Sequence, residues 1–116
     1  MRLRQAVSRV EGFTLIFDSV AIFPAGTVYL VPSPSPGLRT LFEATVSAFP
    51  GAAAERRYDW VPHLTVSRRG GEAVAEMVRA ELAGIEPLAV TVTEVSGWEY
   101  LPDGRWIKRA TAALAG

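Results

Sequence analysis

The chain has 116 residues, the length of one domain with a real hydrophobic core, and its 49% apolar and 21% charged residues are typical of a globular protein. Twelve basic residues balance twelve acidic ones, and this zero net charge argues against broad electrostatic capture of nucleic acid or a membrane. The absence of cysteine excludes disulfides and a thiol nucleophile, and no apolar run reaches a membrane span, so we expect a single cytoplasmic domain over residues 1–116.

The first half of the chain predicts a helix, a hairpin and a second helix. Apolar residues recur at helical spacing over residues 2–10, and the aromatic and branched run 13–23 is typical of a strand. A short turn leads to a second strand over 27–31, which favours an antiparallel hairpin. The next helix is expected to begin at Pro36 and to stop before Pro50.

The second half predicts a loop over 51–60, a strand over 63–67, a third helix, a strand from 88 to about 100 and a closing strand over 105–114. The predicted order is αββαβαββ, an α+β fold with an antiparallel sheet and helices packed on the outside. Gly84 is expected to close the third helix at its C′ position. The third helix is predicted from apolar residues at helical spacing: Val74, Met77, Val78 and Leu82.

The sole histidine, His63, and Thr65 form the candidate catalytic pair. Side chains alternate along a strand, so these two point to one side, and Leu64 and Val66 are expected to point towards a core. An imidazole gives or takes a proton near neutral pH, and a hydroxyl donates to a phosphate oxygen. A lone histidine near a threonine is also common by chance, in which case its role is structural. One histidine without cysteine offers too few ligands for zinc, so we expect no metal and no cofactor.

The surroundings of this pair resemble the 2H phosphoesterase superfamily, which includes bacterial 2′-5′ RNA ligase-like proteins and cyclic nucleotide phosphodiesterases. The resemblance covers nearly the whole chain. The segments that carry it are Phe13-Thr14-Leu15, the hairpin strand ending Val28-Tyr29-Leu30-Val31-Pro32, the helix Leu38 to Phe49, Val61-Pro62-His63-Leu64-Thr65-Val66, and Gly104-Arg105-Trp106-Ile107.

The resemblance implies a pair of His-x-Thr/Ser motifs that face each other across a cleft, with one histidine as general base and the other as general acid. It implies metal-independent chemistry on RNA ends or small nucleotides with 2′,3′-cyclic or 2′-5′ phosphodiester bonds, with His63 and Thr65 as the second motif. The first motif and its β-α-β unit have no counterpart in this sequence, which starts at a predicted helix. We therefore weigh an N-terminally truncated, inactive chain, a homodimer that completes the site, and a non-catalytic phosphate- or nucleotide-binding module.

Other residues near the motif are candidates for substrate binding. Tyr58 and Trp60 either stack a nucleotide base or pack the loop against the sheet, and Arg68 either binds phosphate or lies in a solvated turn. Tyr29 either lines the site or fills it. Three aromatic residues of the last predicted hairpin are expected to pack across its strands rather than to bind a ligand: Trp98, Tyr100 and Trp106.

Overall fold

The computed structural model describes residues 2–51, 60–84 and 87–116. Contacts divide the chain into two compact units, one of residues 1–14, 36–58 and 91–116 and the other of residues 15–35 and 59–90. Within the described residues, no helix combines the length and the apolar character needed to span a bilayer.

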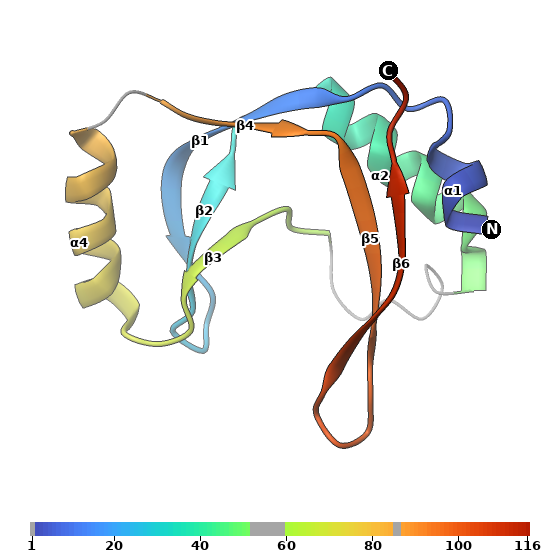
Figure 1. The fold of residues 1–116 in the computed structure, drawn as a ribbon. Helices are drawn as coiled ribbons and strands as arrows, with labels where there is room; N and C mark the ends of the chain where they lie inside the picture. Colours follow the sequence, from blue (N-terminus) through green and yellow to red (C-terminus); the bar gives the residue numbers. More distant parts are fainter. Residues whose placement is uncertain (1, 52–59, 85–86) are drawn as a thin grey trace. The chain divides into compact units, whose positions relative to one another are not determined.

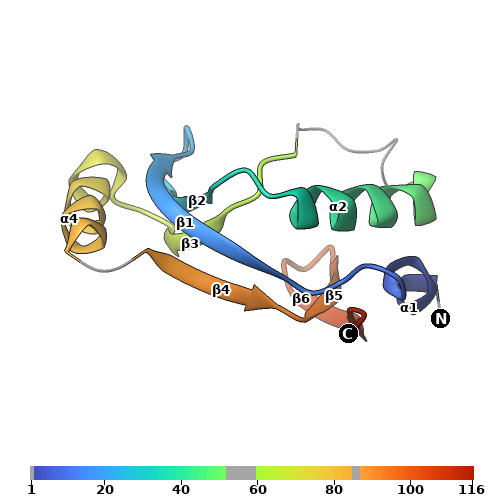
Figure 2. The same ribbon diagram turned by 90° about the horizontal axis from the view of Figure 1, so that it is seen from above.

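The fold is α+β with antiparallel strand pairs, as predicted from the sequence (Figures 1 and 2). Four strands form a sheet in the order β3-β2-β1-β4, and β5 and β6 form a separate hairpin. The elements in chain order are α1 (Arg2–Val7), β1 (Phe13–Ile22), β2 (Val28–Pro32), α2 (Pro36–Ala48), β3 (Leu64–Ser67), α4 (Gly71–Ala83), β4 (Leu88–Val92), β5 (Glu94–Tyr100) and β6 (Trp106–Ala113).

The strand predicted from residue 88 to about residue 100 is two strands. It is interrupted at Thr93, because β4 pairs with β1 in the larger sheet whereas β5 pairs with β6. The predicted first helix ends earlier, at Val7, and the motif strand begins at Leu64 rather than at His63. Among the described residues the observed order is therefore αββαβαβββ, and the other predicted helices and strands are in place. Most of the loop predicted over residues 51–60 lies outside the described residues.

The first unit has a core between its helices and the hairpin. Helix α1 packs against α2 and against β6, so the apolar face predicted for the first helix is buried. Removal of this apolar surface from water favours folding by about 25 cal/mol per Å². The core consists of Leu3, Val7, Val10, Leu41, Ala112 and Leu114.

The second unit is the part of the sheet that holds β2 and β3, with α4 packed against β2 (Figure 1). Strand register places Val20, Leu30 and Leu64 opposite one another, so they share one face of the sheet. Val28 on β2 and Ala75 on α4 are fully buried. The alternate residues of these strands, including Tyr29 and Thr65, lie on the other face.

The prediction that Leu64 and Val66 point towards a core was wrong. Leu64 and Val66 are 44% and 47% exposed, because β3 is an edge strand and α4 packs one strand further in, against β2. Met77 is 68% exposed. The buried residue of α4 is Ala75, and two positions along an α-helix correspond to about 200°, which turns Met77 towards solvent.

Gly70, the N-cap residue of α4, carries a stability prediction. Gly70 has φ 108°, and a Cβ there would lie 2.1 Å from the Val74 Cγ2. Gly70→Ala is therefore expected to lower the free energy of unfolding by about 2–3 kcal/mol, from left-handed strain and overpacking. Urea denaturation measures this loss. Gly84→Ala is the control, since Gly84 has φ −88° and a Cβ added there would meet nothing closer than 3.7 Å. Equal losses in the two variants would contradict the argument.

The C-terminal end of α4 differs in one detail from the prediction. Gly84 is the C-cap itself rather than a left-handed C′ residue, and its N–H reaches the carbonyls of Glu81 and Leu82. Its negative φ is open to any residue, so the glycine is not required there by backbone geometry.

Candidate active site

His63 lies immediately before β3, and its ring is oriented by the backbone. The imidazole Nδ1 is 2.7 Å from the carbonyl oxygen of Val61. A carbonyl oxygen only accepts hydrogen bonds, so Nδ1 carries the proton and donates it. In the neutral ring Nε2 then keeps its lone pair. The local turn thereby selects Nε2 as the nitrogen available to take up a proton.

Two aromatic rings flank the imidazole. The ring centroids of His63 and Phe23 are 5.1 Å apart at 86°, and those of His63 and Tyr29 are 5.6 Å apart at 72°. Phe23 and Tyr29 stack on each other at 4.1 Å, and Tyr29 is 9% exposed. Edge-to-face contacts of this kind favour one ring orientation. Tyr29 therefore fills the space beneath His63, and Phe23 joins a cluster that the sequence did not indicate.

Thr65 lies on the same side of the sheet as these rings. It is directly opposite Tyr29 in the antiparallel β2–β3 pair, and residues opposite each other share a face. The side chain is exposed, and no hydrogen bond to its hydroxyl occurs within the part of the chain that the structure describes. The hydroxyl is thus free to donate to a ligand on the face that His63 borders.

Arg68 follows β3 in the turn that leads to α4. Its carbonyl oxygen accepts a hydrogen bond of 3.4 Å from the Thr27 hydroxyl, which anchors the turn to the β1–β2 hairpin. The residue is exposed, and none of the described carboxylates forms an ion pair with its guanidinium. A free guanidinium on an anchored backbone suits a bidentate phosphate contact.

The two aromatic residues before the motif are less well defined. Trp60 is half-buried, and Tyr58 lies outside the described residues. A base-stacking role for either residue stays a prediction. Metal ligands also do not gather here: the described residues contain no group of three or more His, Cys, Asp or Glu side chains placed to hold an ion.

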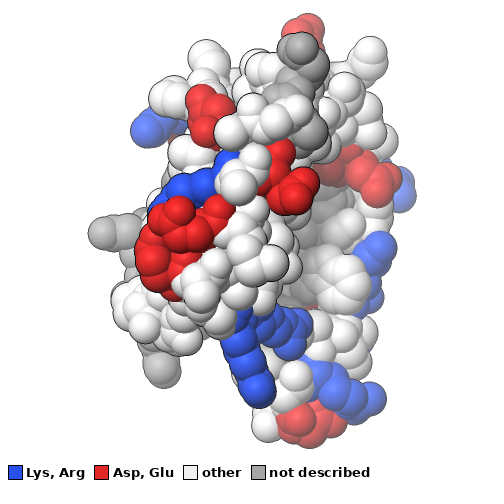
Figure 3. Space-filling model, turned by 90° about the vertical axis from the view of Figure 1, so that its left-hand side faces the viewer, with Lys and Arg blue, Asp and Glu red and all other residues white. Residues whose placement is uncertain are grey.

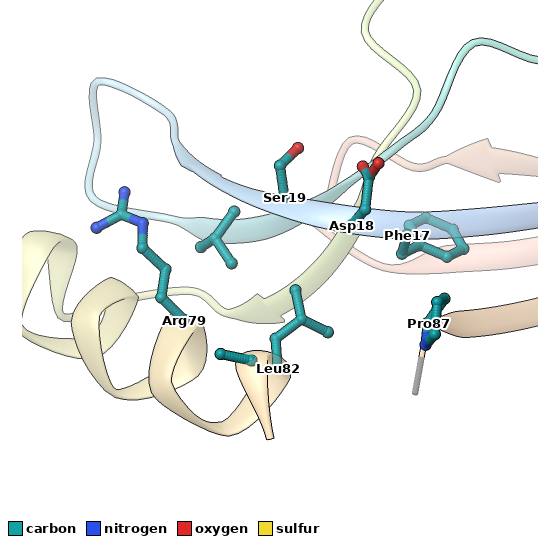
Figure 4. Close-up of a pocket in the computed structure, with 8 residues that line it drawn as sticks. Phe17, Asp18, Ser19, Arg79, Leu82 and Pro87 are labelled. Carbon is teal, nitrogen blue, oxygen red and sulfur yellow. The ribbon is translucent and has the colours of Figure 1, made fainter. Parts of the chain in front are cut away.

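A hollow of about 440 Å³ lies between β1 and α4, away from the candidate pair (Figure 4). Its lining includes Val20, which shares the sheet face opposite to Thr65. Its two charged side chains already have partners within the chain. Asp18 accepts a hydrogen bond of 2.8 Å from Ser33, and Arg79 pairs with carboxylates of its own helix. The candidate site is therefore the exposed face with His63 rather than this hollow.

The carboxylates that hold Arg79 lie on the solvent side of α4. Acidic and basic side chains lie together on this side of the molecule (Figure 3). Arg79 is 2.7 Å from Glu72 and 3.0 Å from Glu76. The hydrogen bond from Arg79 lowers the pKa of Glu72. These pairs are exposed and occupy the Arg79 guanidinium, so they give α4 local order rather than an anion site.

The tautomer of His63 is a direct test of this geometry. Because the sequence has one histidine, its imidazole ¹⁵N signals are unambiguous. In the neutral ring, long-range ¹H–¹⁵N spectra are expected to show a protonated Nδ1 and an unprotonated Nε2. The imidazole signals are assigned to His63 because they are absent from the spectrum of His63→Asn. A neutral ring protonated mainly at Nε2 would contradict the hydrogen bond to Val61.

An α+β fold with an exposed His-x-Thr pair is the arrangement expected of a 2H phosphoesterase. The model of the 2′-5′ RNA ligase superfamily matches residues 1–104, so the chain belongs to that superfamily. A comparison with curated proteins gave no match.

Solved structures show the same fold. The apo form of E. coli LigT has 24% sequence identity and a TM-score of 0.62, over 98% of this chain and 65% of LigT. A structure described as a phosphoesterase has 24% identity and a TM-score of 0.64, over 98% of this chain and 66% of its own. LigT complexed with 3′-AMP has 24% identity and a TM-score of 0.57, over 97% of this chain and 66% of LigT. This chain thus spans just under two thirds of the length of these proteins.

Proposed function

We propose that this chain provides one acid-base half-site of a metal-independent phosphoesterase that acts on 2′,3′-cyclic or 2′-5′ phosphodiesters of RNA ends or small nucleotides. The observation that carries the proposal is the hydrogen bond from His63 Nδ1 to Val61, which leaves Nε2 unprotonated in the neutral ring. Thr65, two residues further along the chain, presents a hydroxyl on the sheet face that also holds Tyr29. The superfamily match supports the reaction class. LigT has been crystallised with 3′-AMP and with NADP+, which supports a nucleotide as the ligand.

The proposed chemistry follows from the orientation of the groups. As general base, His63 Nε2 takes the proton of a water molecule while the water oxygen forms a bond to phosphorus. The bond from phosphorus to one ribose oxygen breaks, and that oxygen receives a proton from a second acidic group. The Thr65 hydroxyl donates to a non-bridging oxygen, where negative charge builds up, and Arg68 pairs with the phosphate.

One imidazole cannot be on both sides of the phosphorus in an in-line displacement. The 116-residue sequence contains one histidine, so the proposed reaction needs a second acid-base group. We propose that a second copy of the chain supplies it, with His63 of each copy at one shared site. Dilution of wild type with His63→Ala at constant total protein tests this. Activity proportional to the square of the wild-type fraction supports a shared site, and direct proportionality contradicts it.

The function itself is tested with a short RNA that ends in a 2′,3′-cyclic phosphate, incubated with wild-type protein and a metal chelator. The expected product is the ring-opened phosphate monoester, at a rate that the chelator leaves unchanged. Chromatography against 2′-phosphate and 3′-phosphate standards identifies which ribose oxygen retains the phosphate, because the two products have the same mass. Absence of product at every protein concentration would overturn the catalytic proposal for this substrate class.

A non-catalytic nucleotide-binding module is the second candidate, favoured by the single histidine. It predicts binding of the same RNA without turnover. Binding is then expected to weaken in Thr65→Ala and in Arg68→Ala, because each removes a phosphate contact, and to persist in His63→Ala. Equilibrium binding measured alongside the product assay separates the two candidates.

A further inference from the structure

The β5–β6 hairpin carries an exposed row of aromatic side chains. In its register Tyr100 is opposite Trp106 and Trp98 is opposite Lys108, so the four side chains share one face. We call these four residues the aromatic strip. Trp98, Tyr100 and Trp106 are 53%, 59% and 61% exposed. More than half of each aromatic side chain is therefore in contact with water.

Contacts within the aromatic strip leave part of each ring surface exposed. The centroids of Tyr100 and Trp106 are 4.8 Å apart, but the rings are tilted by 48° rather than stacked. The Lys108 ammonium lies 5.3 Å above the Trp98 ring centroid. The cross-strand packing expected from the sequence is thus present, and it leaves ring surface free.

One end of the β5–β6 hairpin is packed in the core and the other end is exposed. A register shift between Gly97 and Trp98 separates a base from a tip. At the base, Val95, Ala110 and Ala112 pack into the core of the first unit. The tip extends past α1 and α2 (Figure 1). A bulge increases strand twist and re-aims the side chains beyond it, so the aromatic strip is separate from the core.

The charges of the hairpin tip are mostly paired. Arg105 lies 2.7 Å from Asp103, and Arg109 lies 2.6 Å from Glu99. Lys108 has no carboxylate partner among the described residues. The strip therefore offers ring faces and one available cation, without a strongly basic surface.

We propose that the aromatic strip binds single-stranded RNA, with bases stacked on the rings and Lys108 beside a phosphate. Every base has a π-face, so stacking of this kind accepts any sequence. Trp98 and Tyr100 are two residues apart on one strand, about 7 Å, so successive bases of an unstacked strand can each reach a ring. Adjacent exposed aromatic side chains of this kind are typical of interaction sites. This binding does not depend on the chemistry proposed for His63.

The test is the affinity for a short 5′-labelled oligoadenylate with a free 3′-hydroxyl, measured by fluorescence anisotropy. This probe has no cyclic phosphate to be cleaved. The double variant Trp98→Leu/Trp106→Leu is expected to bind at least about tenfold more weakly, because leucine keeps apolar area but removes the stacking face. Lys108→Ala is expected to reduce the slope of log affinity against log salt by about 0.7, the value for one phosphate contact with a single strand.

Met77→Ala is the matched control, since Met77 is an exposed apolar side chain on α4. It is expected to leave RNA affinity unchanged, and circular dichroism checks that every variant is folded. Unchanged affinity in the double variant, or no binding by wild type, would overturn the proposal. Sedimentation provides a further test. If the wild-type protein forms an oligomer, the double variant is monomeric and neither binds RNA, the aromatic strip is a self-association surface and the proposal is overturned.

A small cyclic substrate separates this proposal from the catalytic one. A mononucleotide 2′,3′-cyclic phosphate has no flanking strand to occupy the strip. Its turnover is therefore expected to be the same in wild type and in Trp98→Leu/Trp106→Leu. Loss of oligoadenylate binding with retained turnover supports both proposals, whereas binding without any turnover supports the strip alone.

Discussion

His63→Ala is expected to lower kcat/KM for an RNA 2′,3′-cyclic phosphate by about 10²–10⁴-fold, the usual contribution of a positioned acid or base. The imidazole is exposed, so its removal leaves the buried residues of the unit in place. The measurement is initial rate against substrate concentration with a metal chelator present. A thermal melt close to that of wild type shows that the loss is chemical.

The matched control for this variant is His63→Asn. The asparagine amide keeps a donor near the Val61 carbonyl but has no group that titrates near neutral pH. It is expected to be as inactive as His63→Ala and at least as stable. Rates within about threefold of wild type in either variant would exclude proton transfer by His63.

Thr65→Val is expected to lower kcat by about 10²–10³-fold, the usual effect of removing one donor to a charge that develops in the transition state. Valine keeps the shape and the strand preference of threonine, so the β2–β3 pairing is preserved. The effect is expected in kcat more than in KM, because the hydrogen bond strengthens as the phosphate oxygens gain charge. Steady-state kinetics on the same cyclic substrate measures the two constants separately.

Thr65→Ser restores the hydroxyl without the methyl group. It is expected to recover most of the activity that Thr65→Val loses, with a remaining deficit from the freer side-chain rotation of serine. If serine were as poor as valine, the methyl group and its packing would be the important feature of Thr65. If valine were as active as wild type, the hydroxyl would have no part in the reaction.

The sequence predicted the hairpin and the candidate pair because each depends on local pattern. Aromatic and branched runs around a short turn specify β1 and β2. Alternation along an extended segment predicts that His63 and Thr65 point to one side. Alternation does not show what covers the other side. Leu64 was expected in a core and is exposed, since burial depends on where α4 packs and on β3 being an edge strand.

The contacts that orient the candidate pair could not be predicted from the sequence, because they also depend on how separate segments pack. Phe23 follows β1 and reaches the imidazole because β1 pairs with β2 and β2 pairs with β3, which a single sequence does not fix. The tautomer of His63 depends on a turn that brings Val61 to its Nδ1. The exposure of Trp106 depends on the bulge and on the reach of the hairpin tip. Each of these features arises from tertiary geometry rather than from residue type.

The central claim is that the imidazole of His63 transfers a proton, and chemical rescue tests it most directly. Imidazole is added to His63→Ala during hydrolysis of an RNA 2′,3′-cyclic phosphate with metal chelated. The position of His63 is exposed, so free imidazole can reach it. The account predicts that the variant regains activity in proportion to added imidazole, while the wild-type rate stays unchanged. A His63→Ala protein that hydrolyses the substrate at the wild-type rate without imidazole would contradict it.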